Sequence, residues 1–415
     1  MGGSQGVDCA VTKKPARPIP LTERKVTRLH RHAIPDDVGE VLWREHGKQV
    51  AVEFPSPKTG QQWELTPLGW VGYVAVSEDF VFWLKPKVEI QNLFRMLEYA
   101  YRLKSFQFLD GTIESSCLED FYERLANVLA KRILDRARRG LYRSYVSESR
   151  DLPFVRGQMD LRRTARAPWD IRLHCHYQIH TPDVEENQIL AWTLLRITRS
   201  DITLDRSLPA VRRAYRMLQG TVDLKQFRPH ECVDRLYNRL NEDYEPLHGL
   251  CRFFLENTGP SHDIGDRRML PFLVNMDRLY ELFIAEWLRV HLPPQWTIEP
   301  KERVYIGADQ NWYFEVDMVL YHADTLEPAC VLDTKYKADK PHVDDIAQVV
   351  AYADSKVCRH AVLIYPYPTD QSLDENVGDV RVRSLTFVLD GELEAEGHEF
   401  VAELISCLPL DQQVG

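Results

Sequence analysis

A short motif in the last third of the chain has the residue types that phosphodiester hydrolysis requires. Asp333 and Lys335 are two positions apart within residues 329–337, a run whose apolar first half predicts a β-strand. Because side chains alternate between the two faces of a strand, we expect both groups on one side and Thr334 pointing away. A carboxylate and an ammonium held together could bind a divalent cation and orient a water molecule.

A second acidic residue, Asp317, lies on what the sequence predicts to be the neighbouring strand. Residues 313–321 alternate between apolar and polar side chains, the pattern of a strand with one buried face. The apolar face is expected to carry Phe314, Val316, Met318 and Leu320, and the other face Glu315 and Asp317. Residues 322–328 suit a hairpin connection, so Asp317 and Asp333 are expected on adjacent strands.

Two predicted helices add further polar groups. Glu281 lies at the edge of the apolar stripe of a helix predicted over residues 276–292, where a charge is costly unless it is paired or binds a metal. Gln348 and Tyr352 are four residues apart in a helical run over residues 344–352, so they share one face. Taken alone, Glu281 also fits a plain boundary residue, and the aspartate–lysine pair a surface salt bridge. The hypothesis therefore rests on the whole set.

The combined set matches the needs of a metal-dependent nuclease. Phosphodiester hydrolysis needs a nucleophilic water and stabilisation of charge on a pentacovalent phosphate, and Mg²⁺, or Mn²⁺ in its place, supplies both through hard oxygen ligands. We expect Glu281, Asp317 and Asp333 to bind the metal, and Lys335 to orient the water and offset the negative charge. The predicted catalytic residues are Glu281, Asp317, Asp333, Lys335, Gln348 and Tyr352.

The chain as a whole predicts an α+β protein of several domains. With 415 residues, 44% of them hydrophobic and 27% charged, it is too long for one ordinary core and has a globular composition. The expected ranges are a disordered leader at 1–20, a β-rich N-terminal domain at 21–110, a mostly helical middle domain at 111–258 and a C-terminal α/β domain at 266–415, with a mixed sheet flanked by helices. Residues 256–268, polar and rich in chain-breaking residues, are expected to link the last two.

Composition and motifs also narrow the possible functions. No apolar run is long enough to span a membrane and no secretory leader is recognisable, so a cytoplasmic protein is expected. The 8 cysteines are scattered without a C-x-x-C pair, which excludes zinc-knuckle spacing. No G-x-x-x-x-G-K-[ST] phosphate loop is present, so the chain by itself should not hydrolyse nucleotides.

The chain has a net charge of −10, but one segment in its middle is locally basic. Residues 131–166 are rich in arginine with few acids to offset them. This fits either a solvated helix face with its loop or a surface that contacts phosphate or a partner. The candidate partner-binding residues in this stretch are Arg138, Arg139, Arg143 and Arg156.

Several of these pieces, in this order, resemble a known nuclease superfamily. Glu281, Asp317, Asp333-Thr-Lys335 and Gln348-x-x-x-Tyr352 are similar to the PD-(D/E)xK superfamily, with Val316 where proline is common, and the last element resembles its RecB-like branch. Further upstream, residues 85–101, 140–145, 155–160, 183–190 and 272–283 resemble the McrC family, the nuclease subunit of modification-dependent McrBC restriction systems. The resemblance runs from about residue 65 to about residue 365.

The McrC resemblance implies a division of labour between two proteins. McrC-like chains act with McrB, an AAA+ GTPase that forms hexameric rings, reads modified cytosine and translocates, whereas McrC stimulates GTP hydrolysis and cuts both DNA strands. GTP would then be bound by the partner and not by this chain, and the basic residues 131–166 would contact the ring. Cleavage of both strands of double-stranded DNA further implies that two copies meet, so dimerisation is expected.

Two other functions remain open from the sequence. One is a regulatory adaptor and GTPase activator whose nuclease fold is inactive, although the intact charged positions argue against such decay. The other is a stand-alone repair nuclease of the RecB type, which would need no NTPase. The long non-catalytic part of the chain argues for a partner instead.

Overall fold

The computed structural model describes residues 18–77, 80–102, 118–166, 169, 171–199, 206–233, 235–257, 262–264, 267–269, 273–306, 312–337, 341–368 and 372–408. The chain divides into two compact units. The first comprises Met1–Lys87 with Gly259–Met276, and the second Val88–Thr258 with Asp277–Gly415. The predicted leader, residues 1–20, lies outside the described residues up to position 17. None of the described helices is both long and apolar enough to cross a membrane.

The described residues of the first unit form two small sheets, a separate two-stranded hairpin and one α-helix. Its elements are β1 (Ile19–Thr22), β2 (Thr27–His30), the 3₁₀ helix η1 (Arg31–Ala33), α1 (Asp36–His46), β3 (Val50–Glu53), β4 (Gln62–Pro67), β5 (Trp70–Ala75), β6 (Val81–Lys85), β10 (His262–Ile264), β11 (Arg267–Met269) and β12 (Leu273–Asn275). The sheets have the orders β1-β6-β5-β12 and β2-β4-β3. One apolar core joins both sheets with α1, because Leu42, Trp63 and Phe82 are buried in the same cluster.

Part of the segment predicted as a linker is folded into this first unit. β10 and β11 form an antiparallel hairpin, and β12 adds to the sheet beside β5, with Leu273 opposite Gly72. Residues 256–268 therefore include a β-hairpin, and the range predicted to begin at 266 starts with strands of the first unit. Main-chain hydrogen bonds can recruit a short strand to a sheet edge without any side-chain pattern, which is why composition did not reveal it.

The helical part of the second unit is a bundle joined to a small sheet. Its elements are α2 (Ile90–Ala100), α3 (Leu118–Arg139), β7 (Ser144–Leu152), β8 (Gln158–Met159), α4 (Leu161–Arg166), β9 (Leu173–Thr181), α5 (Glu185–Thr198), α6 (Leu208–Leu218), the 3₁₀ helix η3 (Pro229–Cys232) and α7 (Tyr244–Asn257). Helices α3, α5, α6 and α7 pack on one another. Helix α3 ends at Arg139, and the next residue, Gly140, has a φ of +104°, which favours glycine.

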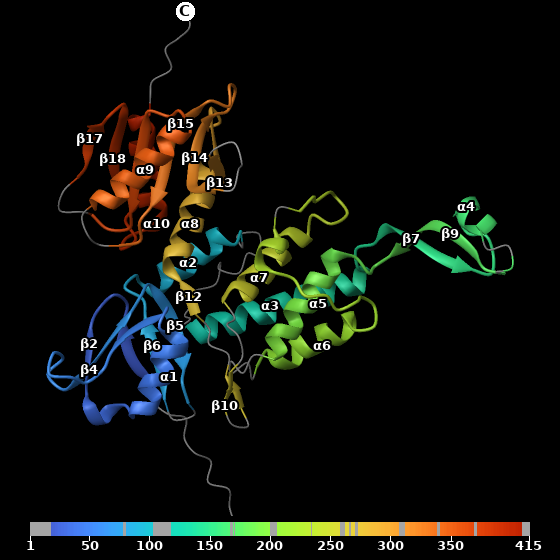
Figure 1. Ribbon diagram of the computed structural model, residues 1–415, viewed down its shortest axis with the longest axis horizontal. Coiled ribbons are helices and arrows are strands. Elements are labelled where there is room, and N and C mark those ends of the chain that lie inside the picture. Colours follow the sequence, from blue (N-terminus) through green and yellow to red (C-terminus); the bar gives the residue numbers. More distant parts are fainter. Residues whose placement is uncertain are drawn as a thin grey trace, which may run out of the picture. The chain divides into compact units, whose positions relative to one another are not determined.

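The C-terminal part of the second unit is one mixed sheet with helices packed on it (Figure 1). Its elements are α8 (Met276–His291), β13 (Trp296–Ile306), β14 (Trp312–His322), β15 (Pro328–Thr334), α9 (Val343–Ser355), β16 (His360–Tyr365), β17 (Asp374–Val377), β18 (Val380–Thr386) and α10 (Leu393–Cys407). The strand order is β13-β14-β15-β16-β18-β17. β15, β16 and β18 run parallel, whereas the outer pairs are antiparallel. Helix α9 covers one face, where Val349 and Ala353 share a core with Val331 and Leu363.

The alternation predicted for β14 breaks at Asp317. In the core under α9, the residues from β14 are Phe314, Val316, Val319 and Tyr321. The prediction that Met318 and Leu320 share a face with Phe314 is therefore wrong. In the β13–β14 pairing, Pro300 lies opposite Met318 and Glu302 lies opposite Val316, but Lys301 and Asp317 between them are not paired. Lys301, between them, has a φ of +56°, which is not extended backbone. Such a local irregularity re-aims the side chain opposite it.

Candidate active site

Asp317 and Asp333 lie beside each other on adjacent antiparallel strands. Met318 pairs with Leu332 in the antiparallel β14–β15 register. One position further along this register, Asp317 of β14 lies opposite Asp333 of β15. The hairpin predicted between the two strands is thus confirmed. Two carboxylates held this close repel each other unless a proton or a cation lies between them.

Thr334 holds one oxygen of Asp317. The Thr334 backbone N donates to Asp317 Oδ2 at 3.0 Å, and the Thr334 hydroxyl donates to the same oxygen at 3.2 Å. The expectation that Thr334 points away from the acidic group is therefore wrong, because the threonine side chain reaches across the strand pair. Two donors on one oxygen fix the Asp317 carboxylate in one orientation.

Asp333 is an almost completely buried carboxylate. Only 1% of the residue is exposed, and its Oδ1 has no hydrogen-bond donor among the residues that the structure describes. Lys335 Nζ lies 2.7 Å from Oδ2 as an ion pair. Burial and the neighbouring Asp317 raise the pKa of Asp333 to about 7, although Lys335 opposes the rise. A buried carboxylate oxygen without a donor is suited to bind a cation.

Lys335 is held by a chain of hydrogen bonds that runs to helix α9. Its Nζ donates to Gln348 Oε1 at 2.9 Å, and Gln348 Nε2 donates to the Tyr352 hydroxyl at 2.7 Å. Burial alone would lower the pKa of Lys335, but its ion pair with Asp333 raises it overall. The ammonium therefore stays charged at neutral pH and is aimed at the Asp333 carboxylate.

Glu281 lies near the same group but is held by cations. Its Oε1 accepts a hydrogen bond from Arg278 at 2.9 Å, and Lys301 Nζ lies 3.6 Å away. Burial raises the pKa of Glu281, Arg278 opposes the rise and Asp317 adds to it. Within the described residues, the ligand atoms of Glu281 and the two aspartates do not all lie within 4.8 Å of one another.

The structure thus brings together five of the six predicted catalytic residues. Asp317 and Asp333 lie opposite each other on adjacent strands, and Lys335, Gln348 and Tyr352 continue from Asp333 through direct contacts. Glu281 lies at the edge of this group. The residues fit a hard divalent cation, since Asp333 offers a buried oxygen without a donor and Asp317 a second oxygen on the next strand. Asp317 and Asp333 would be the main ligands. Glu281 would have to exchange its Arg278 contact to become a third.

Two residues near the site were not anticipated. Asp345, in the first turn of α9, lies 4.0 Å from Lys335 Nζ and also pairs with Lys337. Its Oδ2 accepts from the backbone N of His342, an acidic N-terminal capping pattern that the sequence carried. The hydroxyl of Tyr365 on β16 is buried without a hydrogen-bond partner among the described residues. Burial raises the pKa of Tyr365, and Asp345 and Asp333 add to the rise.

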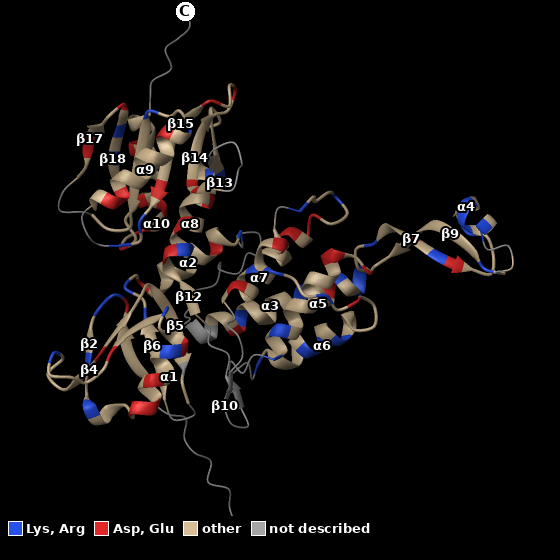
Figure 2. Ribbon diagram, viewed as in Figure 1, with Lys and Arg blue, Asp and Glu red and all other residues tan. Residues whose placement is uncertain are grey.

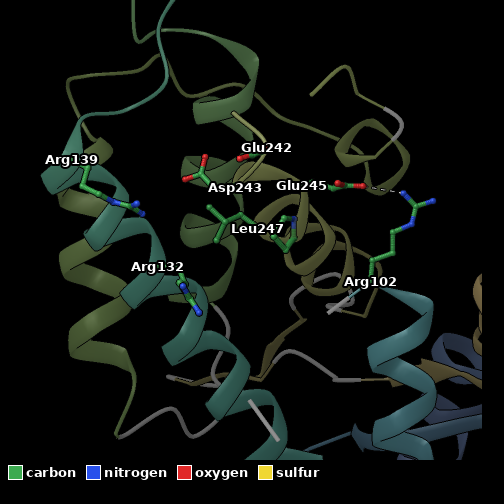
Figure 3. Close-up of a pocket in the computed structure, with 8 residues that line it drawn as sticks. Arg102, Arg132, Arg139, Glu242, Asp243, Glu245 and Leu247 are labelled. Atoms are coloured by element: carbon green, nitrogen blue, oxygen red, sulfur yellow. Dashed lines mark hydrogen bonds and ion pairs between the residues drawn. The ribbon is translucent and has the colours of Figure 1, made fainter. Parts of the chain in front are cut away.

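The four candidate partner-binding arginines are exposed, and each has different surroundings. Arg138 pairs with Asp135 at 2.9 Å, and Arg143 lies exposed just before β7. The guanidinium of Arg156 stacks over the Tyr177 ring at 4.2 Å. Arg139 lines a pocket that also contains Glu242 and Asp243 (Figure 3). The basic character predicted for residues 131–166 is visible on α4 (Figure 2).

The sheet of order β7-β9-β8 carries an unusual set of exposed apolar side chains. Within and around it, Tyr145, Phe154, Val155, Leu161, Trp169 and Ile171 are all exposed. Trp169 and Ile171 are 81% and 89% exposed, far more than a residue of a packed core. Exposed apolar patches are typical of interaction surfaces, which makes this sheet a candidate for one.

Comparison with known proteins identifies a family for this chain. A family model described as "McrBC 5-methylcytosine restriction system component" matches residues 65–366. The chain is 24% identical over 221 residues to the Type IV methyl-directed restriction enzyme EcoKMcrBC of Escherichia coli strain K12. That match covers 50% of this chain and 61% of the relative's length.

Two solved structures from Thermococcus gammatolerans are also similar. A refined half-complex from a tetradecameric assembly of McrB AAA+ hexamers with bound McrC has 18% identity and a TM-score of 0.48, covering 94% of this chain and 100% of that chain. A cryo-EM structure of the McrBC complex has 20% identity and a TM-score of 0.40, covering 67% of this chain and 88% of that chain.

Proposed function

The chain belongs to the family of McrBC 5-methylcytosine restriction system components, and from this premise we propose that it is the DNA-cutting subunit of such a system. Its C-terminal part would be a PD-(D/E)xK nuclease domain that hydrolyses phosphodiester bonds of double-stranded DNA containing modified cytosine. A McrB-like AAA+ GTPase would bind GTP and recognise the modified base, and this chain would stimulate its GTP hydrolysis. The family match supports such a partner, because the family is described as a component of the McrBC system.

One observation carries the nuclease proposal. Asp317 and Asp333 are juxtaposed on neighbouring strands, and Lys335 Nζ lies 2.7 Å from Asp333 Oδ2. Two carboxylates can hold the metal that assists attack of water on a phosphate, and an ammonium beside them can orient that water and offset negative charge. The inactive-adaptor alternative would tolerate loss of any of these groups, yet all are present and in contact.

The chain's own residues would share the catalytic work as follows. A Mg²⁺ ion, or Mn²⁺, bound by the two aspartates would lower the pKa of a water molecule and offset negative charge on the phosphate. Lys335 would orient the attacking water and stabilise the developing charge, because Gln348 holds its ammonium in place. Asp317 would keep its ligand geometry through Thr334. Tyr352 would position Gln348.

We propose that the GTPase docks on the exposed sheet β7-β9-β8 and its flanking arginines. The surface combines exposed Trp169 and Phe154 with basic Arg143 and Arg156. Interfaces are enriched in aromatic residues and arginine, so this composition favours a protein partner. We include Arg138 and Arg139, at the end of α3, in the same proposed docking surface. Cleavage of both DNA strands would further require two copies of the nuclease part to meet.

The proposal is tested by reconstitution with a McrB-like AAA+ GTPase from the same organism. Cleavage of methylated double-stranded DNA is measured with Mg²⁺ and GTP for the wild-type chain, Asp333→Asn and Lys335→Ala. Each substitution should lower cleavage at least ~100-fold, the scale expected when a charged group at the reacting centre is removed. Binding to the partner should stay unchanged. Asp324→Asn, in the exposed turn between β14 and β15, is the matched control.

The same assay separates the alternatives. Full cleavage by Asp333→Asn would refute the site assignment. A wild-type chain that stimulates GTP hydrolysis without cutting would be an adaptor. Cutting that needs neither partner nor GTP would identify a stand-alone repair nuclease instead.

A further inference from the structure

A second set of candidate metal ligands lies away from the nuclease site, where the end of α8 meets the start of α10. His291, Glu394 and His398 each bring one ligand atom into a group whose members all lie within 4.8 Å of one another. His291 Nε2 and Glu394 Oε2 are 3.9 Å apart. A tetrahedral metal about 2.1 Å from each ligand holds them ~3.4 Å apart, so a small closure would complete the geometry.

The ring of His291 is oriented as a metal ligand requires. Its Nδ1 lies 2.9 Å from the carbonyl oxygen of Trp287, a contact in which Nδ1 must carry the proton and donate. The lone pair then belongs to Nε2, the atom that faces Glu394. The imidazole also stacks on Trp287, with ring centroids 4.0 Å apart. A hydrogen bond from the second ring nitrogen to a carbonyl is the usual support of a metal-binding histidine.

The other two ligands come from one face of α10. Glu394 and His398 are four residues apart on this helix, so their side chains share a face. The Tyr99 hydroxyl donates to Glu394 Oε1 at 2.8 Å, which leaves Oε2 directed to the group. His398 lies with its ring centroid 5.2 Å from that of His291, nearly perpendicular to it.

Tight packing sets the spacing of the two helices. Gly397, next to His398, lies so close to Trp287 that an added Cβ would be 2.0 Å from the indole ring. Because Trp287 is one turn before His291 on α8, this contact brings His398 against the end of that helix. The positions of the three ligands therefore follow from a packed core and not from surface side chains alone.

We propose that His291, Glu394 and His398 form a Zn²⁺ site. Two imidazoles and one carboxylate suit zinc, and three protein ligands leave a fourth position for water. Imidazole ligands disfavour Mg²⁺, which prefers oxygen, so the site is distinct in chemistry from the aspartate pair. Bound zinc would clamp the last turn of α8, the helix that also carries Glu281, to α10.

The test uses the full-length chain carrying Asp333→Asn, which weakens metal binding at the nuclease site. The protein is dialysed against Zn²⁺ with excess Mg²⁺, and bound zinc is measured by mass spectrometry. We expect one Zn²⁺ per chain in this parent. His398→Ala and Glu394→Gln should each lose that ion, and zinc should raise the melting temperature of the parent but not of these variants.

Glu399→Gln is the matched control, because Glu399 is exposed on the same helix and outside the ligand group. It should keep the bound zinc and the thermal shift. Since Glu394 and His398 are exposed, their substitutions should leave the fold intact, which circular dichroism checks. The proposal is overturned if the parent retains no zinc, or if His398→Ala binds zinc as well as Glu399→Gln does.

Discussion

Lys335 Nζ donates a hydrogen bond of 2.9 Å to Oε1 of Gln348, a residue 13 positions further along the chain on α9. This bond, with the ion pair to Asp333, determines where the ammonium points. Gln348→Ala should leave Lys335 charged but less well aimed. We expect cleavage to fall ~10- to 100-fold, the range for loss of a supporting hydrogen bond at a metal site. The measurement is the cleavage rate with partner and GTP, and Asp344→Asn on the same helix should have no effect.

Tyr352 should act only through Gln348. Tyr352→Phe removes the hydroxyl that accepts from Gln348 Nε2 at 2.7 Å, so a smaller loss of cleavage is expected, up to ~10-fold. The double variant Gln348→Ala/Tyr352→Phe should cut no more slowly than Gln348→Ala, because the two residues act in series. Losses that multiply in the double variant would show that Tyr352 has an independent role.

Stability should depend on pH through Asp333. Its pKa rises from an ordinary value of 3.8 to about 7 in the folded chain, because of burial and then Asp317. Between these values the folded state binds more protons than the unfolded state, so the free energy of unfolding falls as pH rises from about 4 to about 7.

Asp333→Asn removes this buried charge and should stabilise the chain at pH 8 without divalent cations. A gain on the order of a few kcal/mol is expected from the size of the pKa shift. Denaturant unfolding with a chelator present would measure it. The gain should shrink toward pH 4, and an equal gain at both pH values would contradict this account.

Thr334 should tune metal affinity through Asp317. Thr334→Val removes the hydroxyl that donates to Asp317 Oδ2 but keeps the backbone donor. We expect the dissociation constant for Mn²⁺, measured by titration calorimetry, to rise ~10-fold. Thr325→Val, in the turn between β14 and β15, is the control and should bind Mn²⁺ like the wild type.

The docking surface should be sensitive to charge. Arg143→Glu with Arg156→Glu should weaken binding to the GTPase at least ~10-fold and lower its stimulated GTP hydrolysis, since reversed charges in an interface cost affinity and slow association. Surface plasmon resonance with the reconstituted partner measures the first effect. Arg213→Glu on α6 reverses a charge elsewhere and should bind normally. If the Arg143→Glu/Arg156→Glu variant binds the GTPase as tightly as Arg213→Glu does, Arg143 and Arg156 do not belong to the interface.

Sequence periodicity anticipated the elements around the candidate site. The hairpin of β14 and β15, the helix of Glu281 and the helix of Gln348 and Tyr352 were all readable, because each has a strong apolar period at its own spacing. The neighbourhood of Asp317 and Asp333 also followed from the hairpin. Short strands without such a period, such as β12, were missed, since a sheet edge pairs through main-chain groups.

What the sequence by itself determined was which residues could do chemistry and on which local elements they lie. Only the tertiary structure decided their partners: Thr334 turned toward Asp317, Gln348 bonded to Lys335, Arg278 and Lys301 held Glu281, and His291 met Glu394 across two helices. Local patterns follow from backbone geometry over a few residues. Side-chain partners distant in sequence depend on strand register, on breaks such as that beside Asp317 and on close packing such as Gly397 against Trp287.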